Sequence, residues 1–152
     1  MKQIIFIFIL FFNLNAFSQK NETIDYIKFT YNSSVVLYDE VNITITPYLK
    51  GNEAYSITVE THDKTKKINI SEKKFKEIFD KILKIDNSEL IKSFSVGLDG
   101  ATATLEIGGL LFNSIKYHVW GIYKKDPNRP KKFLKAIQII LKTAEVKIDD
   151  LN

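Results

Sequence analysis

The chain has 152 residues, of which 45% are hydrophobic and 26% are charged, and it carries a formal net charge of +4. A chain of this length and composition can bury enough apolar surface to form one globular domain. It contains no cysteine, which excludes disulfide bonds, thiol catalysis and cysteine-ligated zinc sites.

Residues 1–18 have the three-part pattern of a secretory signal peptide. A positive start at Lys2 is followed by nine consecutive apolar residues, 4–12, and then by small residues at Ala16 and Ser18. The apolar run is much shorter than the about 20 residues that a membrane-spanning helix needs. No cysteine follows it to carry a lipid. We therefore predict a cleaved signal peptide rather than a membrane anchor.

Cleavage before Gln19 leaves residues 19–152 as a single domain, which we expect in the periplasm or outside the cell, without a transmembrane anchor. Loss of Lys2 lowers the formal net charge to +3. The basic residues gather in two stretches, 64–84 and 124–135, and nearly all of them are lysines. Because nucleic-acid recognition favours the planar fork of arginine, we expect no nucleic-acid partner. Binding of the basic stretches to an anionic surface stays open.

Alternation of apolar and polar residues in the first half of the chain predicts β-strands with one buried and one exposed face. The expected strands lie at residues 27–31, 41–46, 55–60 and 67–70. A turn at 50–52 would allow Ile43 to pair with Val59. Ile45 would then lie opposite Ile57, so that both apolar sets share one face of an antiparallel sheet.

After Ile70 the apolar residues recur with the period of an α-helix. Ser71 stands where an N-cap residue belongs, because its hydroxyl can accept a free backbone N–H. Ile70 and Phe75 occupy the two positions of a hydrophobic staple. The expected buried stripe consists of Phe75, Ile78, Phe79, Ile82 and Leu83.

The second half of the chain begins with an ambiguous region. Residues 86–92 fit a loop or a single helical turn, and residues 93–96 fit a short strand. Alternating patterns at 101–107 and 114–120 then predict a β-hairpin. A final helix follows Pro130, which suits a first helical turn because its missing N–H is not needed there. The apolar stripe of that helix consists of Phe133, Leu134, Ile137, Leu141 and Ala144.

The order of these elements predicts an α+β fold. Short connections between sequential strands favour a single, mostly antiparallel sheet. Because the strands have one exposed face, we expect the two helices to pack together on the other face. The predicted order is strands, helix, hairpin, helix.

The polar face of the hairpin is the candidate interaction face. Its residues are Thr102, Thr104, Glu106, Lys116, His118 and Trp120. We expect Ala103 to lie opposite Tyr117, small against large, which places Thr102 opposite His118. Trp120 is the only tryptophan, and it combines a large apolar body with one N–H donor, as an interface anchor does. The alternative is that Trp120 packs over the sheet edge or under residues 121–123.

Motifs for known chemistries are absent from the sequence. The two histidines, His62 and His118, would need carboxylates such as Glu60 or Asp63 to bind a metal, and no HExxH pair is present. The nucleophile elbow G-x-S-x-G and the P-loop are also missing. We therefore assign no catalytic residue, no metal ligand and no cofactor.

These observations favour a non-enzymatic binding or protein-interaction module with an unknown ligand. Its candidate partner is another exported or envelope protein. The alternative function is a small exported hydrolase that uses His118 or His62 as its base.

The signal-peptide prediction can be tested by intact mass. The exported protein should begin at or close to Gln19, because the small residues at Ala16 and Ser18 fit the −3 and −1 positions of a cleavage site. An exported protein that retains residues 1–18 would contradict this prediction.

Overall fold

The computed structural model describes residues 24–34, 40–47, 55–93, 100–109, 113–122 and 128–148. These residues form one six-stranded antiparallel sheet with helices, which confirms the α+β fold. The strands are β1 (Tyr26–Ser33), β2 (Glu40–Pro47), β3 (Tyr55–Thr61), β4 (Thr65–Ile70), β5 (Ala101–Gly108) and β6 (Ser114–Trp120). The helices are α2 (Glu72–Ile82), α3 (Asn87–Lys92) and α4 (Lys131–Ala144). The predicted signal peptide lies outside the described residues.

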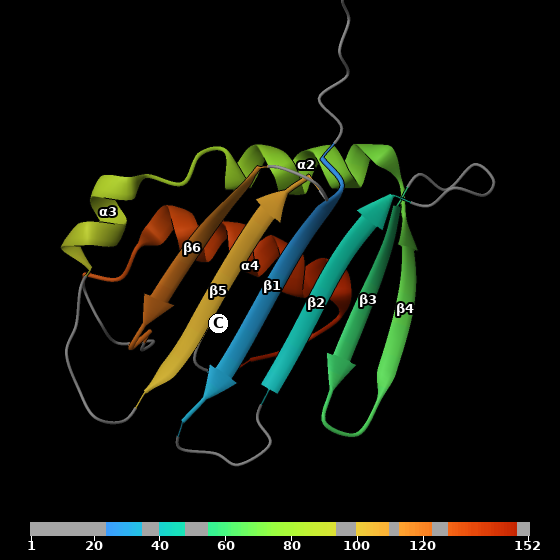
Figure 1. Ribbon diagram of the computed structural model, residues 1–152, viewed down its shortest axis with the longest axis horizontal. Coiled ribbons are helices and arrows are strands. Elements are labelled where there is room, and N and C mark those ends of the chain that lie inside the picture. Colours follow the sequence, from blue (N-terminus) through green and yellow to red (C-terminus); the bar gives the residue numbers. More distant parts are fainter. Residues whose placement is uncertain are drawn as a thin grey trace, which may run out of the picture.

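The strands are ordered β4-β3-β2-β1-β5-β6 across the sheet. The first four strands form a meander in which each strand pairs with the next one along the chain. After α2 and α3 the chain returns to the opposite side of β1, where β5 pairs antiparallel with it. β1 therefore lies inside the sheet, between the meander and the β5–β6 hairpin. Figure 1 shows α2 and α4 together behind the sheet.

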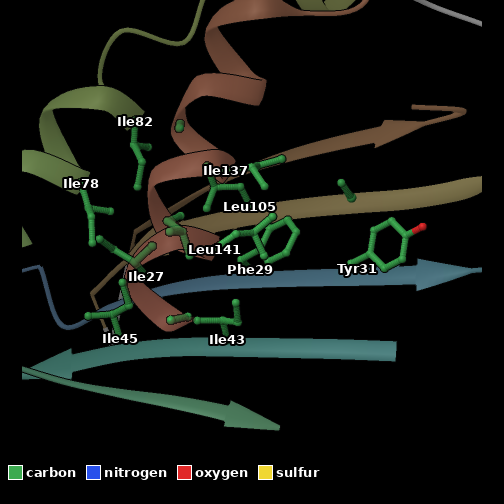
Figure 2. Packing of buried hydrophobic residues seen from close by; sticks show 14 of the residues in the cluster. Ile27, Phe29, Tyr31, Ile43, Ile45, Ile78, Ile82, Leu105, Ile137 and Leu141 are labelled. Carbon is green, nitrogen blue, oxygen red and sulfur yellow. The ribbon is translucent and has the colours of Figure 1, made fainter. Parts of the chain in front are cut away.

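The core lies between the sheet and these two helices. Alternate residues of β1, such as Ile27 and Phe29, point toward the helices and are fully buried. Figure 2 shows Ile78 of α2 and Ile137 and Leu141 of α4 packed over them. The predicted apolar stripe of the final helix is buried along its whole length. Burial of these side chains is the main stabilising contribution to the fold.

The pairing of the meander agrees with the sequence, whereas the predicted hairpin register is wrong by two residues. Ile43 lies opposite Val59, and Ile45 opposite Ile57. In the hairpin, Ala103 lies opposite Val119 instead of Tyr117. A slip of two residues leaves every side chain on its expected face because the side-chain period of a strand is two. Alternation alone could therefore not distinguish the two registers.

The first helix begins as predicted, but its stripe is shorter than expected. The Ser71 hydroxyl accepts the backbone N–H of Lys74 at 3.3 Å and caps the helix. Phe75, Ile78 and Ile82 are buried, whereas Phe79 is only partly buried. Leu83, which we expected in the stripe, is 60% exposed. Leu83 keeps helical backbone angles at the C-cap, so it lies on the Phe79 side of the helix, away from the buried stripe of Phe75, Ile78 and Ile82.

The ambiguous region forms a short helix, α3, and the expected strand at 93–96 does not begin at Ser93. Ser93 ends α3, donating its backbone N–H to the Glu89 carbonyl; residues 94–96 lie outside the described part of the chain. The Asp86 carboxylate caps α3 by accepting the Ser88 backbone N–H at 2.9 Å. Its other oxygen lies 3.1 Å from the Lys132 ammonium of α4.

Helix α3 also supplies a cap for α4. The residue at the N-cap of α4 is Pro130, which makes no side-chain capping hydrogen bond. The Glu89 carboxylate of α3 accepts the backbone N–H of Lys132 at 3.0 Å instead. A negative charge at a helix N-terminus is stabilising, so this contact joins the two helices. None of the described helices is long and apolar enough to cross a membrane.

The packing of α2 allows a prediction of how substitutions in this helix change the stability of the fold. Ile78→Ala should lower the free energy of unfolding by about 2–5 kcal/mol, because it empties a fully buried site. Lys76→Ala on the exposed side of the same helix should change it by about 0.5 kcal/mol or less. Denaturant melts check both variants, and equal losses would mean that the helix faces the sheet differently.

The contacts of Asp86 allow a prediction of how the stability of the fold depends on pH. The hydrogen bonds from Ser88, together with the one from Lys132, lower the pKa of the Asp86 carboxyl to about 2, against about 3.9 in an unfolded chain. The folded state thus binds this proton less readily, so the stabilisation is present above about pH 4 and is lost as the pH falls toward 2. Asp86→Asn keeps a capping side chain and should flatten the decline of the melting temperature in this range. An unchanged acid profile would contradict the prediction.

Candidate functional site

The sheet has one face that the described helices do not cover, and Figure 1 looks directly onto it. We call it the open face. It carries the side chains that alternate with the buried ones, and most of them are threonine, serine, asparagine or charged residues. Examples are Thr30 of β1, Thr44 of β2 and Thr58 of β3, all of them half-buried between neighbouring strands.

All six residues of the predicted interaction face lie on this open face. The register brings them together as three cross-strand pairs. The pairs are Thr102 with Trp120, Thr104 with His118 and Glu106 with Lys116. The corrected register therefore places Trp120, rather than His118, directly beside Thr102.

A shallow hollow of about 390 Å³ lies where β1, β5 and β6 meet on the open face. Its lining residues are Thr30, Asn32, Ser34, Gly100, Thr102, Thr104 and Trp120. Three of these belong to the predicted interaction face. The other four were not predicted, because nothing in the sequence indicated that β1 pairs with β5. Thr30 and Asn32 carried the only available signal, since they alternate with buried residues in β1.

The floor of the hollow is formed by two neighbouring cross-strand pairs, Thr30 with Thr104 and Asn32 with Thr102. Phe29, on the opposite side of β1, is fully buried under the helices. These hydroxyl and amide groups are therefore carried by backbone that the core holds in place.

One end of the hollow is closed by contacts between Ser34 and Gly100. The Ser34 hydroxyl accepts the Gly100 backbone N–H at 2.8 Å and donates to the Gly100 carbonyl at 2.5 Å. The backbone N–H of Ser34 donates to the same carbonyl at 3.1 Å. Gly100 itself is buried. These three hydrogen bonds hold the end of β1 against the beginning of β5.

A chain of polar side chains extends from the hollow onto β2. The Thr30 hydroxyl donates to the Asn42 side-chain oxygen at 2.9 Å, and the Asn42 amide donates to the Glu40 carboxylate at 2.8 Å. A threonine hydroxyl that donates one hydrogen bond still has lone pairs that can accept others. Thr30 can therefore serve as an acceptor toward a ligand without losing this contact.

The charged part of the predicted interaction face lies next to the hollow rather than in it. The Tyr26 hydroxyl donates to the Glu106 carboxylate at 2.5 Å, and this hydrogen bond raises the pKa of the Tyr26 phenol above its ordinary value. Lys116 lies opposite Glu106. The seven residues that line the hollow, in contrast, have no formal charge.

The two histidines are too far apart to act together. His62 lies in the turn between β3 and β4, and His118 lies in β6, four strands away in the sheet. At about 4.8 Å per strand, this separation is roughly 19 Å. No group of three or more potential metal-ligating side chains occurs among the described residues. The metal site considered from the sequence therefore has no geometric support in this part of the chain.

His118 does have a hydroxyl neighbour. Its Nδ1 atom lies 3.0 Å from the Thr104 hydroxyl oxygen. Thr104 belongs to β5, whose backbone pairs on both sides with β1 and β6. The backbone N–H groups of β5 beside Thr104 are thus used in the sheet and are not arranged to stabilise an oxyanion.

Comparisons of this chain with protein-family models, with curated proteins and with solved structures find no match.

Proposed function

We propose that this protein is exported and acts as a non-enzymatic binding module whose recognition site is the hollow on the open face. The observation that carries the proposal is the lining of that hollow by hydrogen-bonding side chains and the only tryptophan of the chain. Binding sites of small ligands typically combine an aromatic or apolar surface with a few polar groups that set orientation.

The strands that carry the site are held in place on both sides and by the core, which favours binding without rearrangement. Thr30, Thr102 and Thr104 lie on β1 and β5, which are both inside the sheet. Backbone hydrogen bonds on both sides hold these strands, and the core fixes them from below. A site that is already in its binding conformation loses less entropy when a ligand binds.

Trp120 is the residue best suited to anchor a ligand. It lines the hollow, it is neither buried in the core nor fully exposed, and it lies beside Thr102 on the edge strand β6. Tryptophan is enriched among the residues that contribute most to binding energy. The partial exposure of Trp120 distinguishes it from the fully buried core aromatics Phe29 and Phe133.

The second candidate function, a hydrolase that uses His118, rests on the contact with Thr104. A hydroxyl nucleophile needs a base that is itself held in orientation by a third group. The nearest acid along this face, Glu106, accepts the Tyr26 hydroxyl instead. We therefore rank binding above hydrolysis.

The binding proposal predicts that Trp120→Ala weakens binding of a partner or ligand by about 2 kcal/mol or more. Folding stability should fall by less than the about 3–5 kcal/mol that is typical of an emptied core aromatic site. Affinity can be measured by titration calorimetry with a partner purified from the envelope or secreted fraction. In the unbound protein iodide should quench the tryptophan fluorescence in part, and binding should protect it.

Thr58→Val is the matched control, because Thr58 is half-buried on the same open face but lies on β3, outside the hollow. It should leave the affinity unchanged. Equal losses in Thr58→Val and Trp120→Ala would contradict the location of the site. If the protein turns over ester or amide substrates and His118→Ala abolishes that turnover, its function is hydrolysis and not binding.

A further inference from the structure

The charge distribution of the open face limits the class of ligand that the hollow can take. Among the described strand residues, the charged side chains on this face are Lys28, Lys67, Lys116, Glu40, Glu60 and Glu106, three of each sign. The exposed lysines of α4, such as Lys131 and Lys135, lie on the helical layer behind the sheet. The described strands therefore give the open face no net charge that would attract a polyanion or a polycation.

The hollow itself is uncharged but rich in hydrogen-bonding groups. An anionic ligand would lose water without gaining an ion pair, which is costly. A purely apolar ligand would displace water from Asn32 and Thr102 without offering hydrogen bonds in its place, which is also costly. The lining thus favours a ligand that is neutral and that both donates and accepts several hydrogen bonds.

Trp120 adds a second requirement. Trp120 lines the hollow, and an indole ring has a large apolar surface. A matching ligand needs an apolar patch in addition to its polar groups. Sugar rings meet both conditions, because their C–H groups form an apolar face and their hydroxyls radiate from the edge.

The spacing of the polar groups is also suitable. Thr30 and Thr104 are opposite each other, as are Asn32 and Thr102. Cross-strand neighbours have Cβ atoms about 5 Å apart, and residues two apart along a strand are about 7 Å apart. These separations are similar to the distance between hydroxyls on opposite sides of one pyranose ring. The volume of about 390 Å³ is near the small end of ligand sites, which run from about 300 to 1,000 Å³.

We propose that the hollow binds neutral carbohydrate, with one sugar ring stacked on Trp120 and its hydroxyls hydrogen-bonded to Thr30, Asn32 and Thr102. This proposal rests on the binding function proposed above. The sugar can be part of a free oligosaccharide, of a cell-surface polysaccharide or of a glycosylated protein, since all three present the same chemistry to the site.

The test uses the exported protein and a panel of soluble oligosaccharides. The neutral members are malto-, cello-, xylo-, manno- and chito-oligosaccharides, and the charged members are oligogalacturonate and a sulfated glycan. Binding is followed through Trp120 fluorescence and the indole N–H signal in NMR spectra. Because stacking on a C–H face is common to neutral pyranoses, at least one neutral member should bind and shift both signals. Its affinity should not depend on ionic strength, since no ion pair is involved.

Two substitutions and one control locate the sugar. Trp120→Ala should lower the affinity by about thirtyfold or more, as expected for an anchor residue. Thr102→Val removes one hydroxyl but keeps the shape of the side chain, so it should also weaken binding while leaving the fold intact. Thr58→Val should bind as the unaltered protein does.

The outcomes separate this proposal from the binding function beneath it. Preference for the charged glycans, or no binding of any neutral sugar, overturns the carbohydrate proposal. A partner protein can be captured equally well before and after enzymatic deglycosylation. If Trp120→Ala reduces this capture, the hollow is a binding site but its ligand is a polypeptide. If no form of binding depends on Trp120, both proposals are wrong. Once the bound sugar is known, mild periodate oxidation or glycosidase treatment of the source fraction identifies where it comes from.

Discussion

The pairing of β1 with β5 is the interaction on which the rest of the structure depends. It runs along all eight residues of both strands and joins two parts of the chain that are separated by two helices. Without it the meander and the hairpin would be two small sheets, each with an additional exposed edge. With it, one continuous surface is available for α2 and α4 to cover, and the hollow forms on the other side.

The same strands thus perform two tasks because their side chains alternate between faces. In β1, Phe29 and Tyr31 enter the core, whereas Thr30 and Asn32 reach the open face. Packing on one side fixes the positions of the polar groups on the other. A hollow built in this way is shallow, but its hydrogen-bonding groups are held in defined positions, and the proposed binding function rests on this arrangement.

Charge has different roles in the two layers. On the helical side, Asp86 and Glu89 of the α3 region contact Lys132 and tie α3 to the start of α4. Among the described strand residues of the open face, the charges of the two signs balance and lie outside the hollow. The positive net charge of the chain is therefore a poor guide to its ligand, since much of the excess lysine lies on α4 and faces away from the candidate site.

The sequence by itself determined the faces of the strands, the cap at Ser71, the stripe of α4 and the grouping of Thr102 and Trp120 on one surface. These features depend on local periodicity, which residues near one another in the chain encode directly. Only the tertiary structure decided the hairpin register, the exposure of Leu83 and the presence of Thr30 in the candidate site. Side-chain alternation is unchanged by a two-residue slip, and the neighbours of a strand across a long connection depend on packing of the whole chain.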